Sequence, residues 1–294
     1  MISVMAGPTV RRLQLGTKLE QLRVDAGVSR LDAAAAIGCS EPRIGHIETG
    51  RNAPSKSDLI VLVARLYGAD EATLAALEEL REEASKRGWW STYRLPKWLA
   101  GYVGLETDAV SLRCLDIEII PGLLQTEQYM RRLYTLSAPP PTKEIDRLVR
   151  ARLQRQSRLS GPNAVQLSAV VSQGALERCA RDKAVAGAQL AQLLERATWP
   201  NVDLRVLPFD LGLHVGTGPF TLLAFPDQLL PDAAYQEYAV GGHIIDDPSI
   251  VARLATLFDE LRSQALDPNE SLAMIAQFIE HTNASNARRG IDEG

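Results

Sequence analysis

The chain has few of the residues that build disulfide frameworks or metal centres. Its 294 residues include three cysteines and four histidines, and both sets are scattered. An odd number of distant cysteines excludes a disulfide framework and is typical of a reducing compartment. No two of these side chains have the spacing of zinc ligands, so we expect no metal and no cofactor.

Long apolar runs are also missing. No stretch approaches the ~20 apolar residues that a membrane-spanning helix requires, and the first residues lack the apolar core of a secretory signal. Hydrophobic residues make up 46% of the chain and charged residues 23%, as in ordinary globular proteins. We therefore expect a cytoplasmic protein that contacts no membrane and has room for two domains.

The net charge of −4 conceals two segments of opposite sign. Residues 1–68 hold 9 basic and 6 acidic side chains, a net charge of +3. Residues 69–294 hold 23 basic and 30 acidic side chains, a net charge of −7. Because the local charge decides whether a surface attracts nucleic acid, the acidic total does not exclude DNA as a partner of the first segment.

Helical periodicity and turn residues divide the chain into three parts. Residues 1–87 predict five helices separated by glycines and capping residues. Residues 88–104 contain Trp89, Trp90 and Trp98 and predict a packed aromatic junction. Residues 105–294 alternate helices with short strands, which favours a larger mixed α+β domain over a doubly wound parallel sheet. The expected fold class is thus a mainly α N-terminal five-helix domain followed by a mixed α+β domain.

Residues 30–49 have the pattern of a helix-turn-helix. Ala34 is small where the second helix crosses the first, Gly38 permits the positive φ of the turn, and Ile44 and Ile47 face inward. The outward and flanking positions would then meet double-stranded DNA, with Arg43 suited to the edge of a guanine. A helical bundle whose charges are only solvated is the alternative. The candidate DNA-binding residues are Arg30, Ser40, Glu41, Arg43, Gly45, His46, Arg51, Asn52 and Lys56.

A helix predicted over residues 143–159 has charge on its apolar face. Helical spacing places Arg152 and Gln156 inside that face and Arg155 at its edge. An unpaired charge there would be costly, so we expect an acidic partner such as Glu177 or Glu237, or an anionic ligand or partner group that enters a pocket. A buried structural ion pair is the more common outcome of such a pattern.

Several longer motifs resemble a known family. SEPRIGHIETGRNAPS resembles the recognition helix and loop of XRE (lambda-repressor-like) domains. The sequence departs from this family at Leu31 and Glu41, where the family often has polar residues, commonly Gln at the second position. Farther along, RGWW, IIPGLLQTEQYMRRL and NVDLRVLPFDLGLHVGTGPFTLLAF resemble actinobacterial regulators of the WhiJ-like, antitoxin-like group. The resemblance implies transcriptional control, a C-terminal domain of poorly known role and, often, a small acidic partner protein encoded nearby.

The leading hypothesis is a homodimeric, sequence-specific DNA-binding transcriptional regulator. Its large domain would receive a regulatory input, a small partner protein, and would dimerise together with the aromatic junction. One alternative is an antitoxin-like module that sequesters a small partner and binds DNA to regulate itself. A second is an enzyme fused to a helix-turn-helix domain. We expect no catalytic residues because no catalytic motif is present, but a perturbed carboxylate in a closed pocket would favour the enzyme.

Overall fold

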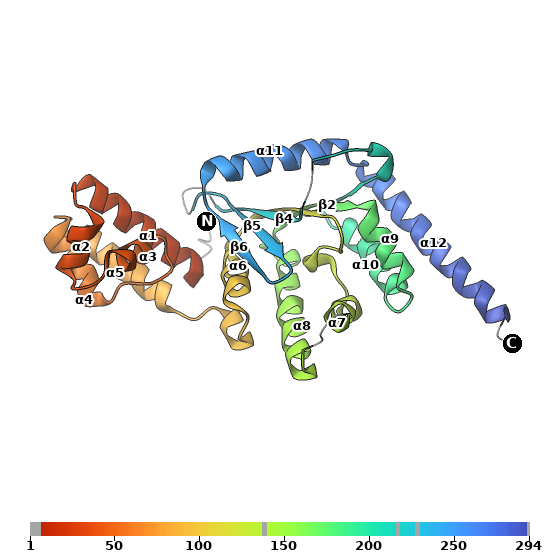
Figure 1. Ribbon diagram of the computed structural model, residues 1–294, viewed down its shortest axis with the longest axis horizontal. Helices are drawn as coiled ribbons and strands as arrows, with labels where there is room; N and C mark the ends of the chain where they lie inside the picture. Colours follow the sequence, from red (N-terminus) through yellow and green to blue (C-terminus); the bar gives the residue numbers. More distant parts are fainter. Residues whose placement is uncertain (1–6, 137–139, 216–217, 227–229, 293–294) are drawn as a thin grey trace. The chain divides into compact units, whose positions relative to one another are not determined.

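Helices α1 to α5 form the N-terminal part of the chain (Figure 1). The computed structural model describes residues 7–136, 140–215, 218–226 and 230–292, with side chains up to residue 282. Gly38 ends α2 with a φ of 63° and Gly50 ends α3 with a φ of 67°, a conformation that glycine adopts without strain. The bounds are α1 (Pro8–Asp25), α2 (Arg30–Ala36), α3 (Glu41–Glu48), α4 (Lys56–Ile60), the π-helical continuation η1 (Val61–Leu66) and α5 (Glu71–Ser85).

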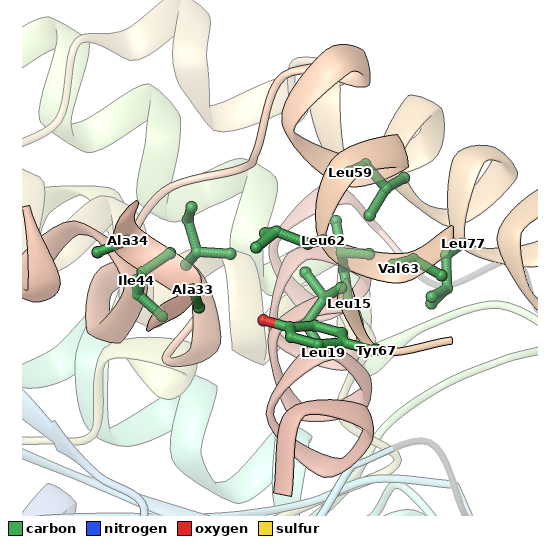
Figure 2. Close-up of a cluster of buried hydrophobic side chains, with 11 residues drawn as sticks. Leu15, Leu19, Ala33, Ala34, Ile44, Leu59, Leu62, Val63, Tyr67 and Leu77 are labelled. Atoms are coloured by element: carbon green, nitrogen blue, oxygen red, sulfur yellow. The ribbon is translucent and has the colours of Figure 1, made fainter. Parts of the chain in front are cut away.

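One apolar cluster holds these helices together (Figure 2). Leu15 and Leu19 of α1 meet Ile44 of α3 and Leu62 of η1, and each is at most 1% exposed. Burial of such a side chain contributes about 1.5–3 kcal/mol. At Gly16 the helices α1 and α3 come so close that an added Cβ would lie 2.3 Å from the carbonyl oxygen of residue 48. The core therefore fixes α3 against α1 with almost no freedom.

The aromatic segment is divided between two compact units. The first unit comprises Met1–Arg94, Val103–Asp108 and Pro226–Leu230, and the second comprises Leu95–Tyr102, Ala109–Phe225 and Pro231–Gly294. In the first unit, Trp89 and Trp90 of the short helix η2 (Trp89–Tyr93) meet edge to face at 6.0 Å. Trp90 is 8% exposed and packs against the positions of Gly88 and Gly104. The residues expected as one junction, 88–104, thus contribute to both units.

A mixed six-stranded sheet is the centre of the second unit, in the order β3-β2-β1-β4-β5-β6. β1, β2 and β3 are parallel, whereas β4 pairs antiparallel with β1 and is followed by the antiparallel β5 and β6. The predicted fold class is confirmed. The bounds are β1 (Ser111–Asp116), β2 (Gln166–Ser172), β3 (Val202–Leu207), β4 (Phe220–Ala224), β5 (Ala233–Tyr238) and β6 (Gly241–Ile245).

Helices cover both faces of this sheet. α11 packs across one face through Val251, Phe258 and Leu261, while α7 and α8 lie on the opposite side (Figure 1). No helix in the described ranges is both long and apolar enough to cross a membrane. The bounds are α6 (Lys97–Asp108), η3 (Gly122–Leu124), α7 (Glu127–Thr135), α8 (Thr142–Gln156), η4 (Ser157–Leu159), α9 (Gln173–Arg181), α10 (Ala186–Ala197), η5 (Phe209–Leu211), α11 (Pro248–Gln264) and α12 (Pro268–Asp292).

Alternation along β1 sends its side chains to opposite faces. Arg113 points to α11, where its guanidinium lies 3.2 Å from Asp259 and 5.7 Å from the ring centroid of Phe258. Because successive residues of a strand alternate, Cys114 and Asp116 belong to the other face. The carboxyl of Asp116 is therefore directed away from α11, to the side on which α8 lies.

Candidate functional sites

Helix α3 presents one face to the core and one to solvent. Ile44 and Ile47 are 1% and 2% exposed, and Ala34 of α2 is equally buried. Ser40, Glu41 and His46 are exposed, so the N-terminal end of α3 is open to an approaching molecule. The positive end of the helix dipole at this end favours an anionic group such as a phosphate.

Arg43 is oriented by the cap of the next helix. Its Nη2 donates to Oδ2 of Asp58 at 2.7 Å, and this hydrogen bond raises the pKa of Arg43. The same oxygen accepts from the backbone N–H of Ser55 in the capping box of α4. A guanidinium has five N–H donors, and the side chain of Arg43 is 39% exposed, so donors remain for a base edge.

Two other candidate basic residues are engaged in ion pairs. Arg30 donates from Nε to Glu48 at 2.6 Å and from Nη2 to Glu20 at 2.8 Å. Lys56 lies 3.0 Å from Glu78 of α5, and its side chain is 59% exposed. Contacts of these two residues with DNA remain a prediction. To bind a phosphate, each side chain would have to leave its acidic neighbour or contact both groups at once.

The remaining candidates surround α3 on the surface. Arg51 and Asn52 are exposed in the loop after the helix, where the backbone N–H of Asn52 donates to the carbonyl of His46 at 3.0 Å. An added Cβ at Gly45 would meet no atom within 4 Å, so this position of α3 is open to an approaching molecule. α3 and its following loop therefore offer one continuous exposed segment.

Sequence reasoning missed Glu48, a buried residue of α3 that holds this helix against its neighbours. It is 4% exposed and accepts from Nε of Arg23 at 2.5 Å as well as from Arg30. The signal was its position four residues after Ile44, on the inward face of α3. A carboxylate buried there requires basic partners, and both arginines serve that purpose.

The second unit contains a pocket of about 400 Å³ on the side of the sheet away from α11. Tyr102 and Tyr235 stack at 4.1 Å in its wall, and Leu112 and Leu167 add apolar surface. The charged residues that line it are Asp116, Glu118, Arg152, Arg155 and Glu237.

Helix α8 supplies the two arginines, in a different arrangement from the one predicted. Arg155, expected at the edge of the apolar face, is 7% exposed and lies 5.2 Å from the ring centroid of Tyr102. Arg152 donates to Oε1 of Gln125 and lies 5.7 Å from the ring of Tyr134. Gln156 does not line the pocket, because it donates to the carbonyls of residues 122 and 125 at 3.1 and 2.7 Å.

Of the two expected acidic partners, one lies in the pocket and one does not. Glu237 lines it and accepts from the hydroxyl of Tyr235 at 3.3 Å. Glu177 lies elsewhere, on α9, and pairs with Arg181 one turn along the same helix at 3.2 Å. The expectation for Glu177 was wrong because a local i,i+4 partner was available to it.

Asp116 is the pocket residue that the sequence analysis overlooked. Desolvation raises its pKa to about 7, the charge of Glu237 adds to the rise, and Cys114 and Arg152 oppose it. Within the described part of the chain, neither Asp116 nor Glu237 forms an ion pair. The signal was an acid at the end of a strand whose preceding alternate residues, Leu112 and Cys114, are buried.

The pocket does not have the donor set of a metal centre. Among the residues that the structure describes, no group of three or more His, Cys, Asp or Glu side chains could hold a metal ion. Its chemistry is that of carboxylates beside arginines, within apolar walls.

Comparison with known proteins assigns both units. Residues 99–277 match the family described as Domain of unknown function (DUF5753), and the chain belongs to this family. Residues 14–77 match a helix-turn-helix domain, the domain of a DNA-binding regulator. No curated protein and no solved structure matches the chain.

Proposed function

We propose that the chain is a sequence-specific transcriptional regulator that reads DNA with α3 and the following loop. The observation that supports this most is the position of Arg43, which is held by Asp58 beside the exposed end of α3. An arginine oriented in this way has lost much of its side-chain freedom before it meets a guanine, which lowers the entropic cost of a bidentate contact.

Substitution of Arg43 tests this proposal. Arg43→Ala should weaken binding to a specific site, taken from DNA crosslinked to the protein in cells, by about 1–3 kcal/mol. Binding to random DNA should change much less, because phosphate contacts supply that affinity. Arg150→Ala, which removes an exposed arginine of the second unit, serves as the control. Equal losses on specific and random DNA would mean that Arg43 only contacts phosphate.

The second unit, in this proposal, receives the regulatory input. Residues 69–294 carry 23 basic and 30 acidic side chains and would repel DNA laid against them, so this part adds no phosphate affinity. The family resemblance favours a small partner protein as the source of the input. A pull-down from native lysate with and without DNA tests this, and the absence of any partner in both samples would contradict it.

We further propose that the regulator is a homodimer. One helix-turn-helix domain covers a half-site, and two-fold pairing provides the affinity of a full operator. Trp90 is buried within its own unit, so Trp89 and Trp98, both partly exposed, are the aromatic residues available to a second copy. Light scattering should give the dimer mass at micromolar concentration, and a monomer both free and on DNA would contradict this.

Asp116 favours one second candidate, an enzyme fused to the DNA-binding domain. A carboxyl whose pKa is raised to about 7 is suited to proton transfer near neutral pH. The pocket holds it beside Cys114 and Arg152. We favour binding over catalysis, because no catalytic sequence motif accompanies this carboxyl. Recovery of a bound compound unchanged after long incubation would support this choice, and turnover that Asp116→Asn abolishes would favour the enzyme.

A further inference from the structure

We propose that the pocket of the second unit binds a small molecule that carries one protonated amine on an apolar body. The starting point is the distribution of charge within the pocket. The two arginines come from α8, while the acids come from β1, from the segment that follows it and from β5.

Three of the five charged groups are committed within the protein. Glu118 lies 2.5 Å from Nε of Arg178, outside the pocket. Arg155 is 7% exposed beneath Tyr102, and Arg152 is held by Gln125 and Tyr134. The partners of Arg152 are neutral, and so is the ring of Tyr102, so these contacts cancel the charge of neither arginine.

The two acids that remain, Asp116 and Glu237, repel each other. Asp116 and Glu237 both line the pocket, and the charge of Glu237 raises the pKa of Asp116. Unpaired charge in a partly desolvated site is costly. A positively charged group between the two carboxyls would relieve their repulsion, whereas an anion placed there would add to it.

Strand geometry leaves room for such a group between the two carboxyls. Asp116 ends β1 and Glu237 lies in β5, with β4 between them. Neighbouring strands are about 4.8 Å apart, so the two backbones are separated by about 10 Å at this end of the sheet. The cross-strand pairs Cys114 with Thr221 and Thr221 with Tyr235 put both carboxyls on one face. An ammonium group can therefore donate to both.

The walls indicate the rest of the ligand. Tyr102, Tyr235, Leu112 and Leu167 enclose the space beside the carboxyls with apolar and aromatic surface. A volume of about 400 Å³ lies in the range of pockets for small organic molecules. An aromatic or branched aliphatic body would remove this surface from water, and the ammonium would fix its orientation.

Binding of the amine should be linked to the protonation of Asp116. Its pKa of about 7 means that the free pocket is partly protonated near neutral pH, and a bound ammonium displaces that proton. Between pH 8 and pH 6 the affinity should fall about tenfold, because the ionised fraction of Asp116 falls by that factor. The other titratable or charged groups that line the site are Glu237, Glu118, Cys114, Arg152, Arg155 and the phenols of Tyr102, Tyr235 and Tyr238.

The experiment uses 2-phenylethylamine as the probe, with 2-phenylethanol and phenylacetate as the neutral and anionic controls. Titration calorimetry on the full chain should detect binding of the amine. Near pH 7 the measured binding enthalpy should vary with the ionisation enthalpy of the buffer, because binding releases a proton. Asp116→Asn and Glu237→Gln should each weaken binding at least tenfold. Glu177→Gln, which changes a carboxylate of α9 that pairs with Arg181 and does not line the pocket, should not.

Two results would overturn the proposal. If phenylacetate binds more tightly than the amine, the pocket is an anion site of the arginines. If none of the three compounds binds at millimolar concentration, the pocket does not accept small charged molecules. Glu237 is exposed, so its variant should fold even if Asp116→Asn does not, and melting curves establish this.

Reading the ligand as a regulatory input rests on the proposed function, and a separate measurement tests that step. DNA affinity is measured with and without the amine. Binding of the amine without any effect on DNA affinity would support the site and contradict its regulatory role. A changed DNA affinity that Glu237→Gln abolishes would support both.

Discussion

The two units differ in whether a desolvated carboxylate has an ion-pair partner. In the first unit, Glu48 accepts hydrogen bonds from Arg23 at 2.5 Å and Arg30 at 2.6 Å, and the three side chains lock α3 in place. In the second unit, Asp116 has no ion-pair partner among the described residues, and its pKa rises to about 7. The first arrangement holds a structure, whereas the second leaves a charge for a ligand. A buried acid is thus informative only once its partners are known.

The largest expected effect comes from removal of the satisfied acid. Glu48→Ala leaves the buried Arg23 without its nearest carboxylate, while Arg30 keeps Glu20, and should lower the free energy of unfolding of the first unit by about 3–5 kcal/mol. Thermal unfolding followed by circular dichroism measures this. Glu41→Ala, at an exposed position of the same helix, should change stability by less than about 0.5 kcal/mol. Similar effects of the two variants would show that the ion pairs of Glu48 do not hold α3 in place.

A second contrast lies between two glycines of the first unit. Gly16→Ala would place a methyl group 2.3 Å from the backbone carbonyl oxygen of residue 48, so the helices must separate at a cost of about 1–3 kcal/mol. Gly45→Ala meets no atom within 4 Å and should stabilise α3 by about 0.5–1 kcal/mol. Urea unfolding of both variants checks the signs. A stabilising Gly16→Ala would show that α1 and α3 are not packed as described.

The smallest effect expected concerns the pH dependence of stability. A carboxyl whose pKa rises on folding favours the folded state while it is protonated, and this contribution is lost as pH rises from about 4 to about 7. Asp116→Asn should therefore gain about 1–2 kcal/mol over the parent at pH 8, with no gain near pH 4. Denaturant unfolding across this range measures the difference, with Glu118→Gln as the control. Parallel stability curves for parent and Asp116→Asn would contradict the raised pKa.

The helical unit was largely predictable because its signals are local. Helix caps, the glycine at the turn and the spacing of Ile44 and Ile47 all act within a few residues. The partners of Arg30 were not predictable in this way, since Glu48 lies 18 residues away and reaches Arg30 only through the angle between α2 and α3. The sequence alone therefore does not show whether a basic residue near a recognition helix contacts DNA or pairs with an acidic residue of its own domain.

The pocket was only partly predictable, for a different reason. Helical periodicity placed Arg152 on the apolar face of α8, but it could not say which strands the helix covers. Asp116, Tyr235 and Glu237 come together only through the crossing of β4 between β1 and β5. The choice of Glu177 failed for another reason, because Arg181 lies one turn along the same helix and pairs with it.

The central claim is that α3 reads base sequence through an arginine that the fold positions. Selection of bound DNA from a random pool by the full chain, followed by sequencing, tests this most directly. The parent protein should enrich a motif that contains a preferred guanine, and Arg43→Ala should lose the preference at that position while it keeps the flanking ones. No enriched motif for the parent, or identical base preferences for parent and variant, would contradict the account.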